Sequence, residues 1–212
     1  MVVLIIDSTS SILQIGLCNN NKVINKRLDS NSNHSKTALK AIDEVLEEFN
    51  LTVSNVDQII VNVGPGSFTG IRIGVALAKS LGYSLNIPVI PINSLLQNVI
   101  GYEQEYLISL IDARHNNCYC AIYDNEYNVV LKEQFMSYDE LFDIASKLEG
   151  NYLLIGAPDK VDHNVRVANF DIAKIIDYSK SLPIPVIHNV NPLYLKKTAA
   201  EIQKEEVARW KY

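Results

Sequence analysis

The chain has 212 residues, of which 48% are hydrophobic, and a formal net charge of −5 at pH 7. This length suits one large domain or two small ones with a substantial core. No apolar run approaches the length of a membrane span, and residues 1–7 lack the basic region and cleavage site of a signal peptide. The three cysteines form no C-x-x-C pair and are expected to be free thiols. We therefore expect a cytoplasmic protein without membrane association.

Lysine and arginine form no cluster before the C-terminal tail. A domain that grips nucleic acid by itself carries a basic patch, because phosphate contacts supply much of the affinity. If the protein works on RNA, we expect a partner to hold the nucleic acid.

The N-terminal half begins with three predicted strands, which are joined by serine-rich and asparagine-rich turns. A helix with apolar residues at helical spacing and an acidic opposite face follows. A strand and a second helix come next, and Asn86 with Pro88 supplies a stop for that helix. The expected elements are strands 2–7, 12–18 and 22–28, helix 36–49, strand 56–63, helix 69–85, strand 89–92 and helix 94–100.

The second half repeats this order of elements. Ser137 and Glu140 have the spacing of a capping box at the start of its helix. Asp7 and Asp112 end the first strand of each half. The expected elements are strands 106–112, 117–123 and 129–135, helix 138–149, strand 152–155 and a terminal helix at 194–210.

These patterns predict an α/β fold of two duplicated subdomains, each a mixed sheet with flanking helices. The first is expected to span residues 1–104 and the smaller second one residues 105–212, which includes the terminal helix.

A glycine-rich turn joins the strand at 56–63 to the helix at 69–85. Gly64, Gly66 and Gly70 give G-x-G-x-x-x-G, whereas a dinucleotide-binding turn needs G-x-G-x-x-G. A P-loop needs a lysine at the end of the turn, and the nearest one here, Lys79, lies far down the helix. The turn is therefore predicted to be a poor phosphate site.

The helix at 69–85 is apolar over an arc roughly twice the ~100° of an ordinary surface helix, with only Arg72 and Lys79 marking a solvent side. Gly70 and Gly74 each cost about 1 kcal/mol of helix propensity relative to alanine, so a closely approaching element must offset them. Packing against the chain's own sheet and helix 36–49 is the more common explanation. Burial of part of this surface by a second protein is the alternative.

Asp7, Ser8 and Thr9 lie together where the first strand ends. A carboxylate there can hold a metal and hydroxyls can contact phosphate, but the same residues more often close a tight turn. Asp112 is the counterpart of Asp7, and Arg114 beside it can pair with it. The sequence contains no H-x-x-x-H, H-E-x-x-H or G-x-S-x-G motif, so we expect neither a metal site nor a catalytic residue.

Four segments carry a resemblance to known proteins. They are GPGSFTGIRIGVALAK at 64–79, IIDSTS at 5–10, IDARHNNCY at 111–119 and NPLYLKK at 191–197. Together they resemble the TsaB (YeaZ) family of bacterial tRNA-modification proteins, and the doubled pattern with Asp7 is similar to the actin–hexokinase–Hsp70 superfamily.

The resemblance implies a non-catalytic scaffold or activator in the complex that transfers threonylcarbamoyl to the adenosine next to the tRNA anticodon. Such a chain would bind the transferase TsaD, work with the ATPase TsaE, need no cofactor, pair with itself when alone and meet tRNA only through the complex. In the family the first two helices form the surface for TsaD or a second TsaB, which favours burial of helix 69–85 by a partner. The residues implied in partner binding are Ala38, Ile42, Val45, Gly70, Ile73, Gly74, Leu77, Ala78 and Leu81.

The superfamily also suggests an enzymatic alternative, a small ATP-dependent kinase that uses Asp7 and Asp112. The nucleotide-binding candidates are Asp7, Ser8, Thr9 and Asp112. A metallopeptidase is a further alternative, and the missing H-x-x-x-H argues against it. Under the scaffold hypothesis, Gly74→Leu is expected to leave the chain folded but unable to bind TsaD, and Asp7→Ala to matter much less.

Overall fold

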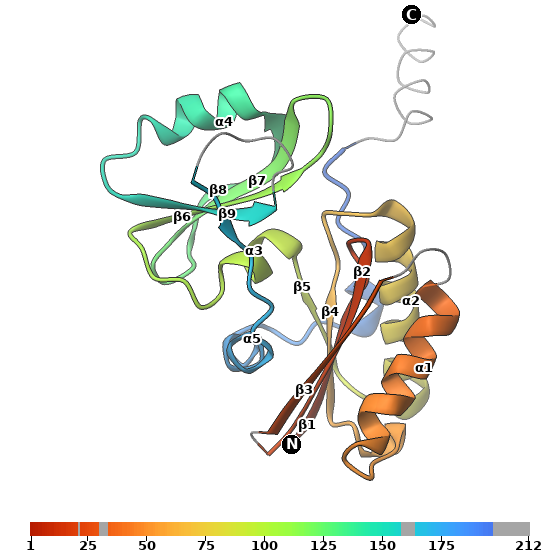
Figure 1. Cartoon of the computed structure of the whole chain (residues 1–212). Helices are drawn as coiled ribbons and strands as arrows, with labels where there is room; N and C mark the ends of the chain where they lie inside the picture. Colours follow the sequence, from red (N-terminus) through yellow and green to blue (C-terminus); the bar gives the residue numbers. More distant parts are fainter. Residues whose placement is uncertain (21, 30–33, 158–163, 197–212) are drawn as a thin grey trace, which may run out of the picture.

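The computed structural model describes residues 1–20, 22–29, 34–157 and 164–196. Two five-stranded sheets with flanking helices make up the molecule (Figure 1). The N-terminal sheet has the order β3-β2-β1-β4-β5 and the C-terminal sheet the order β10-β9-β6-β7-β8. Because the two orders correspond strand for strand, the predicted α/β fold of two duplicated subdomains is confirmed.

The first three strands of each sheet are antiparallel, and the last two run parallel to the first strand. The strands are β1 (Val2–Asp7), β2 (Ile12–Asn19), β3 (Lys22–Asp29), β4 (Gln58–Asn62), β5 (Val89–Ile92), β6 (Tyr106–Asp112), β7 (Asn117–Asp124), β8 (Val129–Ser137), β9 (Tyr152–Ala157) and β10 (Arg166–Val167). The helices are α1 (His34–Glu47), α2 (Phe68–Leu85), α3 (Ser94–Val99), α4 (Tyr138–Ala145) and α5 (Ile172–Ser179), with short 3-10 turns at Val53–Asn55 and Ile187–Asn189.

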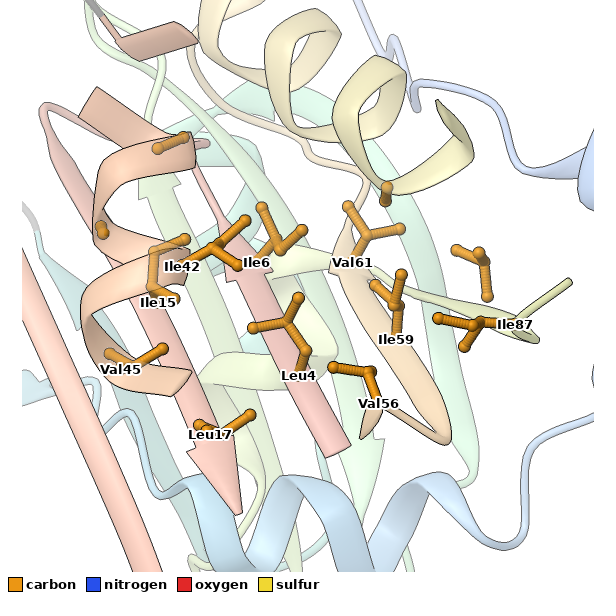
Figure 2. Packing of buried hydrophobic residues seen from close by; sticks show 14 of the residues in the cluster. Leu4, Ile6, Ile15, Leu17, Ile42, Val45, Val56, Ile59, Val61 and Ile87 are labelled. Carbon is orange, nitrogen blue, oxygen red and sulfur yellow. The ribbon is translucent and has the colours of Figure 1, made fainter. Parts of the chain in front are cut away.

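The strands alternate their side chains between two cores, one on each face of the N-terminal sheet. On one face Leu4 and Ile15 pack against Ile42 and Val45 of α1, and α2 lies beside α1 (Figures 1 and 2). On the other face the core takes in α3, α5 and apolar side chains of the C-terminal sheet, such as Leu107. The second core therefore joins the two sheets.

The segment after β10 returns to the N-terminal sheet. Helix α5 packs on β2 and β3, and residues 187–193 lie against α2 and the first core. The predicted division at residues 104 and 105 separates the two sheets but does not describe this returning segment, so it stays a prediction.

Most expected elements have the predicted place, and the capping box at Ser137 is present. The sequence reading omits β10 and α5. A signal for α5 exists, since Asp171 caps the helix through Lys174 N and Ile172, Ile175 and Ile176 are buried at helical spacing. The predicted helix at 194–210 lies mostly outside the described residues, and 194–196 are not helical.

Within the described ranges, no helix combines the length and the apolar character that crossing a bilayer requires.

Candidate functional site

The glycine-rich turn connects β4 to α2. Gly64 has a φ of 101°, which a residue with a side chain rarely adopts. Ser67 then caps the helix by accepting a hydrogen bond from Gly70 N at 3.2 Å, while its own N–H donates to the Thr9 carbonyl at 2.6 Å. The start of α2 is therefore tied to the loop between β1 and β2.

Two glycines of α2, Gly70 and Gly74, face this same loop. A Cβ added at Gly70 would overlap the Ser8 carbonyl oxygen, and one added at Gly74 would overlap the Ser8 hydroxyl. The Ser8 hydroxyl donates to the Gly70 carbonyl at 2.7 Å. Close approach by the chain's own β1–β2 loop thus accounts for both glycines, as the intramolecular explanation anticipates.

The structure also places the other residues that the family resemblance implies in partner binding. Ala38, Ile42, Val45 and Ala78 are at most 2% exposed and belong to the first core, and Gly70 and Gly74 are buried as well. Their side chains are not available to a partner in this structure. The remaining three, Ile73, Leu77 and Leu81, are half-buried. This geometry argues against the expectation that Gly74→Leu would leave the fold intact, because a Cβ at Gly74 would already overlap the Ser8 hydroxyl.

One side of α2 remains uncovered and carries no charge. Since residues follow one another at about 100° around a helix, it forms a continuous arc. We name it the α2 stripe: Thr69, Ile73, Ala76, Leu77, Ser80 and Ser84, of which Ile73 and Leu77 are half-buried and the others exposed.

The charged side of α2 contacts the returning segment. Arg72 lies 3.9 Å from the ring centroid of Phe68 and donates from Nε to the Tyr194 hydroxyl at 2.8 Å. Lys79 donates to the carbonyls of His188 and Val190 at 3.3 and 3.0 Å. Both cations of the helix thus have partners within the chain, and neither belongs to the α2 stripe.

The second candidate region surrounds Asp7, which is 4% exposed. Its Oδ1 accepts hydrogen bonds from Thr9 N and Thr9 Oγ1 at 2.9 and 2.7 Å. Its Oδ2 accepts from Asn62 Nδ2 at 3.0 Å and from Gln97 Nε2 at 2.6 Å. The carboxylate therefore joins β1, β4 and α3, and each of its oxygens already has two donors.

Two adjoining cavities lie between the sheets. The first, of about 180 Å³, is lined by Asp7 and Thr9 of the nucleotide-binding candidates. The second, of about 380 Å³, is lined by Thr9, Asp112 and Arg114. Asp112 accepts hydrogen bonds from Arg114 N at 3.3 Å and from the Tyr138 hydroxyl at 3.2 Å. The structure thus brings Thr9 to both cavities and places Asp7 and Asp112 in different ones.

Ser8 lines neither of these cavities, because its hydroxyl points into α2. Sequence reasoning also missed the polar partners of Asp7. Asn62 was a visible signal, since it is a polar residue at the end of an apolar strand. Gln97 gave no comparable signal, because it lies in a short helix far away in the sequence.

Two sheets of one topology with polar residues between them define a protein with the duplicated actin/Hsp70-like fold. A family model described as tRNA N6-adenosine threonylcarbamoyltransferase (TsaD) matches residues 28–208. The chain therefore belongs to this family, and its relatives place it among the TsaB (YeaZ) members.

Two relatives share the name TsaB. A tRNA threonylcarbamoyladenosine biosynthesis protein TsaB from Bacillus subtilis is 36% identical over 63% of this chain and 59% of its own length. The TsaB of Haemophilus influenzae is 38% identical over 41% of this chain and 38% of its own length. Each match thus spans less than two thirds of the relative's own length. The solved structure of YeaZ from Pseudomonas aeruginosa is similar in fold, with a TM-score of 0.74 at 20% identity over 92% of this chain and 99% of that one.

Proposed function

We propose that this chain is a non-catalytic subunit in the formation of threonylcarbamoyladenosine on tRNA, and that it acts by binding a TsaD-type transferase. The names of the relatives and the match to the transferase family model support this proposal. The net charge of −5 is unfavourable for direct binding to tRNA phosphates. In this proposal the other subunits of the complex hold the tRNA.

The observation that carries the proposal is the α2 stripe. The cores of protein interfaces are depleted in charge, since each charge must be desolvated on binding. Small side chains such as Ala76 and Ser80 let another helix come within the 8–10 Å typical of packed helices. We propose that the partner-binding role implied for α1 and α2 falls on the α2 stripe, where Ile73 and Leu77 supply the half-buried apolar contacts.

The Asp7 region supports a structural role more than a kinase site. A carboxylate that holds a metal ion needs a free oxygen lone pair, and both oxygens of Asp7 accept two hydrogen bonds from the chain itself. In this proposal Asp7 fixes the β1–β2 loop on which α2 rests, and the kinase alternative gains no support from this geometry.

The proposal includes two further partners, a second copy of the chain and a TsaE-type ATPase. A second copy of the chain would occupy the α2 stripe when TsaD is absent, and would compete with it. A TsaE-type ATPase would join the assembly that contains both subunits. The absence of a cofactor requirement is part of the proposal.

The test mixes the purified chain with the TsaD of the same organism and measures mass by size-exclusion chromatography with light scattering. Ala76→Glu places a charge in the α2 stripe at an exposed position, so the fold is kept and the affinity should fall about tenfold or more. Val167→Glu on β10, where Val167 is 77% exposed, is the matched control.

Binding by wild type and Val167→Glu but not by Ala76→Glu supports the assignment. Equal binding by all three chains would place TsaD on another surface. If no complex forms under any nucleotide condition, the subunit role itself is wrong, and the nucleotide affinity of the isolated chain becomes the next measurement. Loss of the homodimer with Ala76→Glu would show that both partners share the α2 stripe.

A further inference from the structure

An exposed apolar region adjoins the α2 stripe near the C-terminal end of the helix. Tyr83 of α2 is 75% exposed, and Ile184 and Val186 of the returning segment are 62% and 65% exposed. Tyr83 and Ile187 both line two hollows, of about 260 and 450 Å³. The smaller hollow also takes in Ser80 of the α2 stripe. The stripe and the apolar region are therefore continuous, and contiguous exposed apolar surface is typical of a docking site.

The last described residues lie beside the other end of α2. Tyr194 stacks on Phe68 with ring centroids 4.9 Å apart, and its hydroxyl accepts a hydrogen bond from Arg72 Nε at 2.8 Å. These contacts fix the point from which the chain continues after Lys196. Residues 197–212, which lie outside the described residues, therefore begin next to the first turns of α2.

This segment is long enough to reach the apolar region. Tyr83 lies eleven residues beyond Arg72 on α2, which is about 17 Å at about 1.5 Å per residue. The sequence predicts a helix for the terminal segment, and a helix advances about 21 Å over the fourteen residues from Lys196 to Trp210. Trp210 can thus come to the level of Tyr83.

The side chains of the segment suit an uncharged, partly apolar surface. Most of its apolar residues fall within about 160° of a helix with about 100° per residue. They are Ala199, Ala200, Ile202, Val207 and Trp210. Gln203 and Glu206 share this arc, and the hydroxyls of the α2 stripe can donate hydrogen bonds to both. Trp210 has the largest apolar area to bury, and its N–H needs a polar neighbour such as Ser80.

We propose that residues 197–212 pack along the α2 stripe of their own chain and that Trp210 enters the hollows beside Tyr83. Attachment at Lys196 favours this occupant, because a short connection gives an effective concentration on the order of millimolar. A partner of the stripe must then displace the segment. This competition rests on the proposed function of the α2 stripe, whereas the packing does not.

Trp210 supplies the test, because it is the only tryptophan of the chain and its fluorescence reports on this segment alone. Quenching by acrylamide is measured in the full chain, at dilutions where light scattering finds only monomer. Trp210 should be protected relative to the chain unfolded in urea, at every protein concentration. Ala76→Glu, which places a charge in the stripe, should remove the protection, and Val167→Glu should keep it. Tyr83→Ser is the second variant if Ala76→Glu fails to fold.

Three outcomes would overturn the packing. They are free quenching of Trp210 in the wild-type monomer, protection that Ala76→Glu and Tyr83→Ser leave unchanged, and protection that disappears on dilution. The last outcome would assign the segment to a second copy of the chain.

The competition is measured separately with the TsaD of the same organism. If the packed segment leaves the stripe free in one chain out of about ten, Trp210→Ser should raise the affinity about tenfold. An unchanged affinity beside a protected Trp210 would overturn the competition. Because the fluorescence measurement needs no TsaD, the packing can fail or hold whatever surface TsaD binds.

Discussion

The two copies of the repeated unit share one topology but differ where their first strands end. Asp7 is buried and accepts four hydrogen bonds, two of them from side chains of β4 and α3. Asp112 is half-buried and accepts its bonds from the turn beside it and from Tyr138. Duplicated topology therefore does not carry duplicated chemistry, because the side chains that face the strand end come from elements with different sequences.

The register shows the origin of this difference. In the N-terminal sheet Ile6 pairs with Val61, and the next residue, Asn62, supplies a donor to Asp7. In the C-terminal sheet Ile111 pairs with Ala157, the last residue of β9. The hydrogen bonds to Asp7 thus depend on Asn62 at the end of β4, together with Thr9 and Gln97.

The largest expected effect is the loss of stability when Asp7, rather than Asp112, is replaced. Asp7→Ala leaves the side-chain donors of Asn62 and Gln97 buried without an acceptor, and should lower the free energy of unfolding by about 3–5 kcal/mol. Asp112→Ala should cost about 1 kcal/mol or less, since water can replace its partners. Urea denaturation of both variants measures the difference.

If both variants lost similar amounts of unfolding free energy, Asp7 would not have a greater structural role than Asp112. The loss of unfolding free energy also matters for the expectation that Asp7→Ala has little effect on tRNA modification. If that variant loses modification, the folded fraction must be measured before the loss is attributed to a nucleotide site.

A second expectation concerns α2, the helix that packs onto the first loop of the N-terminal copy. Gly74→Leu should lower the free energy of unfolding by about 2 kcal/mol or more, because the side chain collides with Ser8. Ala76→Leu, two residues along on the α2 stripe, should change it by less than about 0.5 kcal/mol. If Gly74→Leu proved as stable as wild type, the contact with the β1–β2 loop would not explain the glycine.

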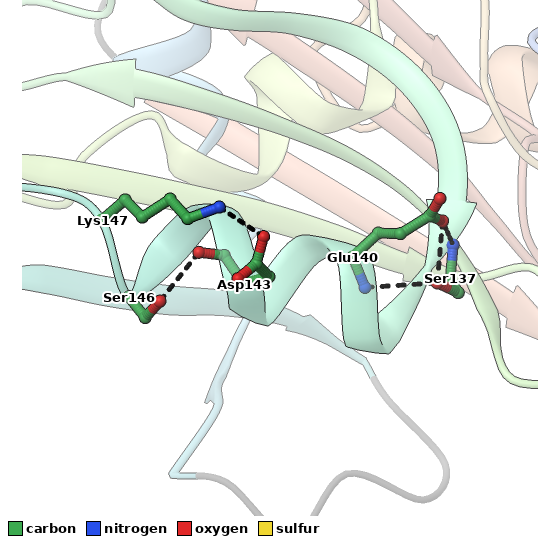
Figure 3. A network of polar contacts seen from close by, with 5 residues as sticks. All are labelled: Ser137, Glu140, Asp143, Ser146 and Lys147. Carbon is green, nitrogen blue, oxygen red and sulfur yellow. Dashed lines mark hydrogen bonds and ion pairs between the residues drawn. The ribbon is translucent and has the colours of Figure 1, made fainter.

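The smallest expected effect concerns helix α4 of the C-terminal copy. The start of this helix is held by hydrogen bonds between residues close in the sequence. Ser137 accepts from Glu140 N at 3.2 Å, and the Glu140 carboxylate accepts from Ser137 N and Oγ at 2.8 and 2.7 Å (Figure 3). Ser137→Ala should cost about 1 kcal/mol. Ser146→Ala, which removes a donor to Asp143 O at the other end of α4, should cost less and serves as the control.

This local effect should also depend on pH. The hydrogen bonds from Ser137 hold the pKa of Glu140 below its usual value. The stabilisation is therefore complete above the unfolded pKa of about 4.3 and is lost as the pH falls through the lowered value in the folded chain. Ser137→Ala removes the hydroxyl bond, so its deficit in unfolding free energy should shrink below about pH 4 but not vanish. An unchanged deficit would show that Glu140 contributes nothing through this bond.

The elements that sequence predicts well are those with short-range signals. Alternation and turn residues locate the strands, and the cap residues Ser137 and Asn86 mark a helix start and a helix end, the latter with left-handed backbone. Helix α5 was missed although Asp171 and its apolar spacing were visible, because the flanking segment reads as irregular.

The candidate sites were predictable only in outline. The sequence shows that α2 is apolar on too many sides, but not that its small residues face the β1–β2 loop while the α2 stripe faces outward. The spacing of Gly70 and Gly74 is the same whether the neighbour is the chain itself or another protein, since a period of about 100° identifies a face and not its partner.

By itself the sequence determined the repeated unit, the fold class, the capping residues and the family resemblance, because these rest on patterns between residues near one another in the chain. Only the tertiary structure decided that Asp7 is held by Asn62 and Gln97, 55 and 90 residues away. It also decided that the glycines at 70 and 74 lie against Ser8 of the chain's own β1–β2 loop. Hydrogen-bond partners and burial of this kind depend on which distant strand ends meet, and no local period records that.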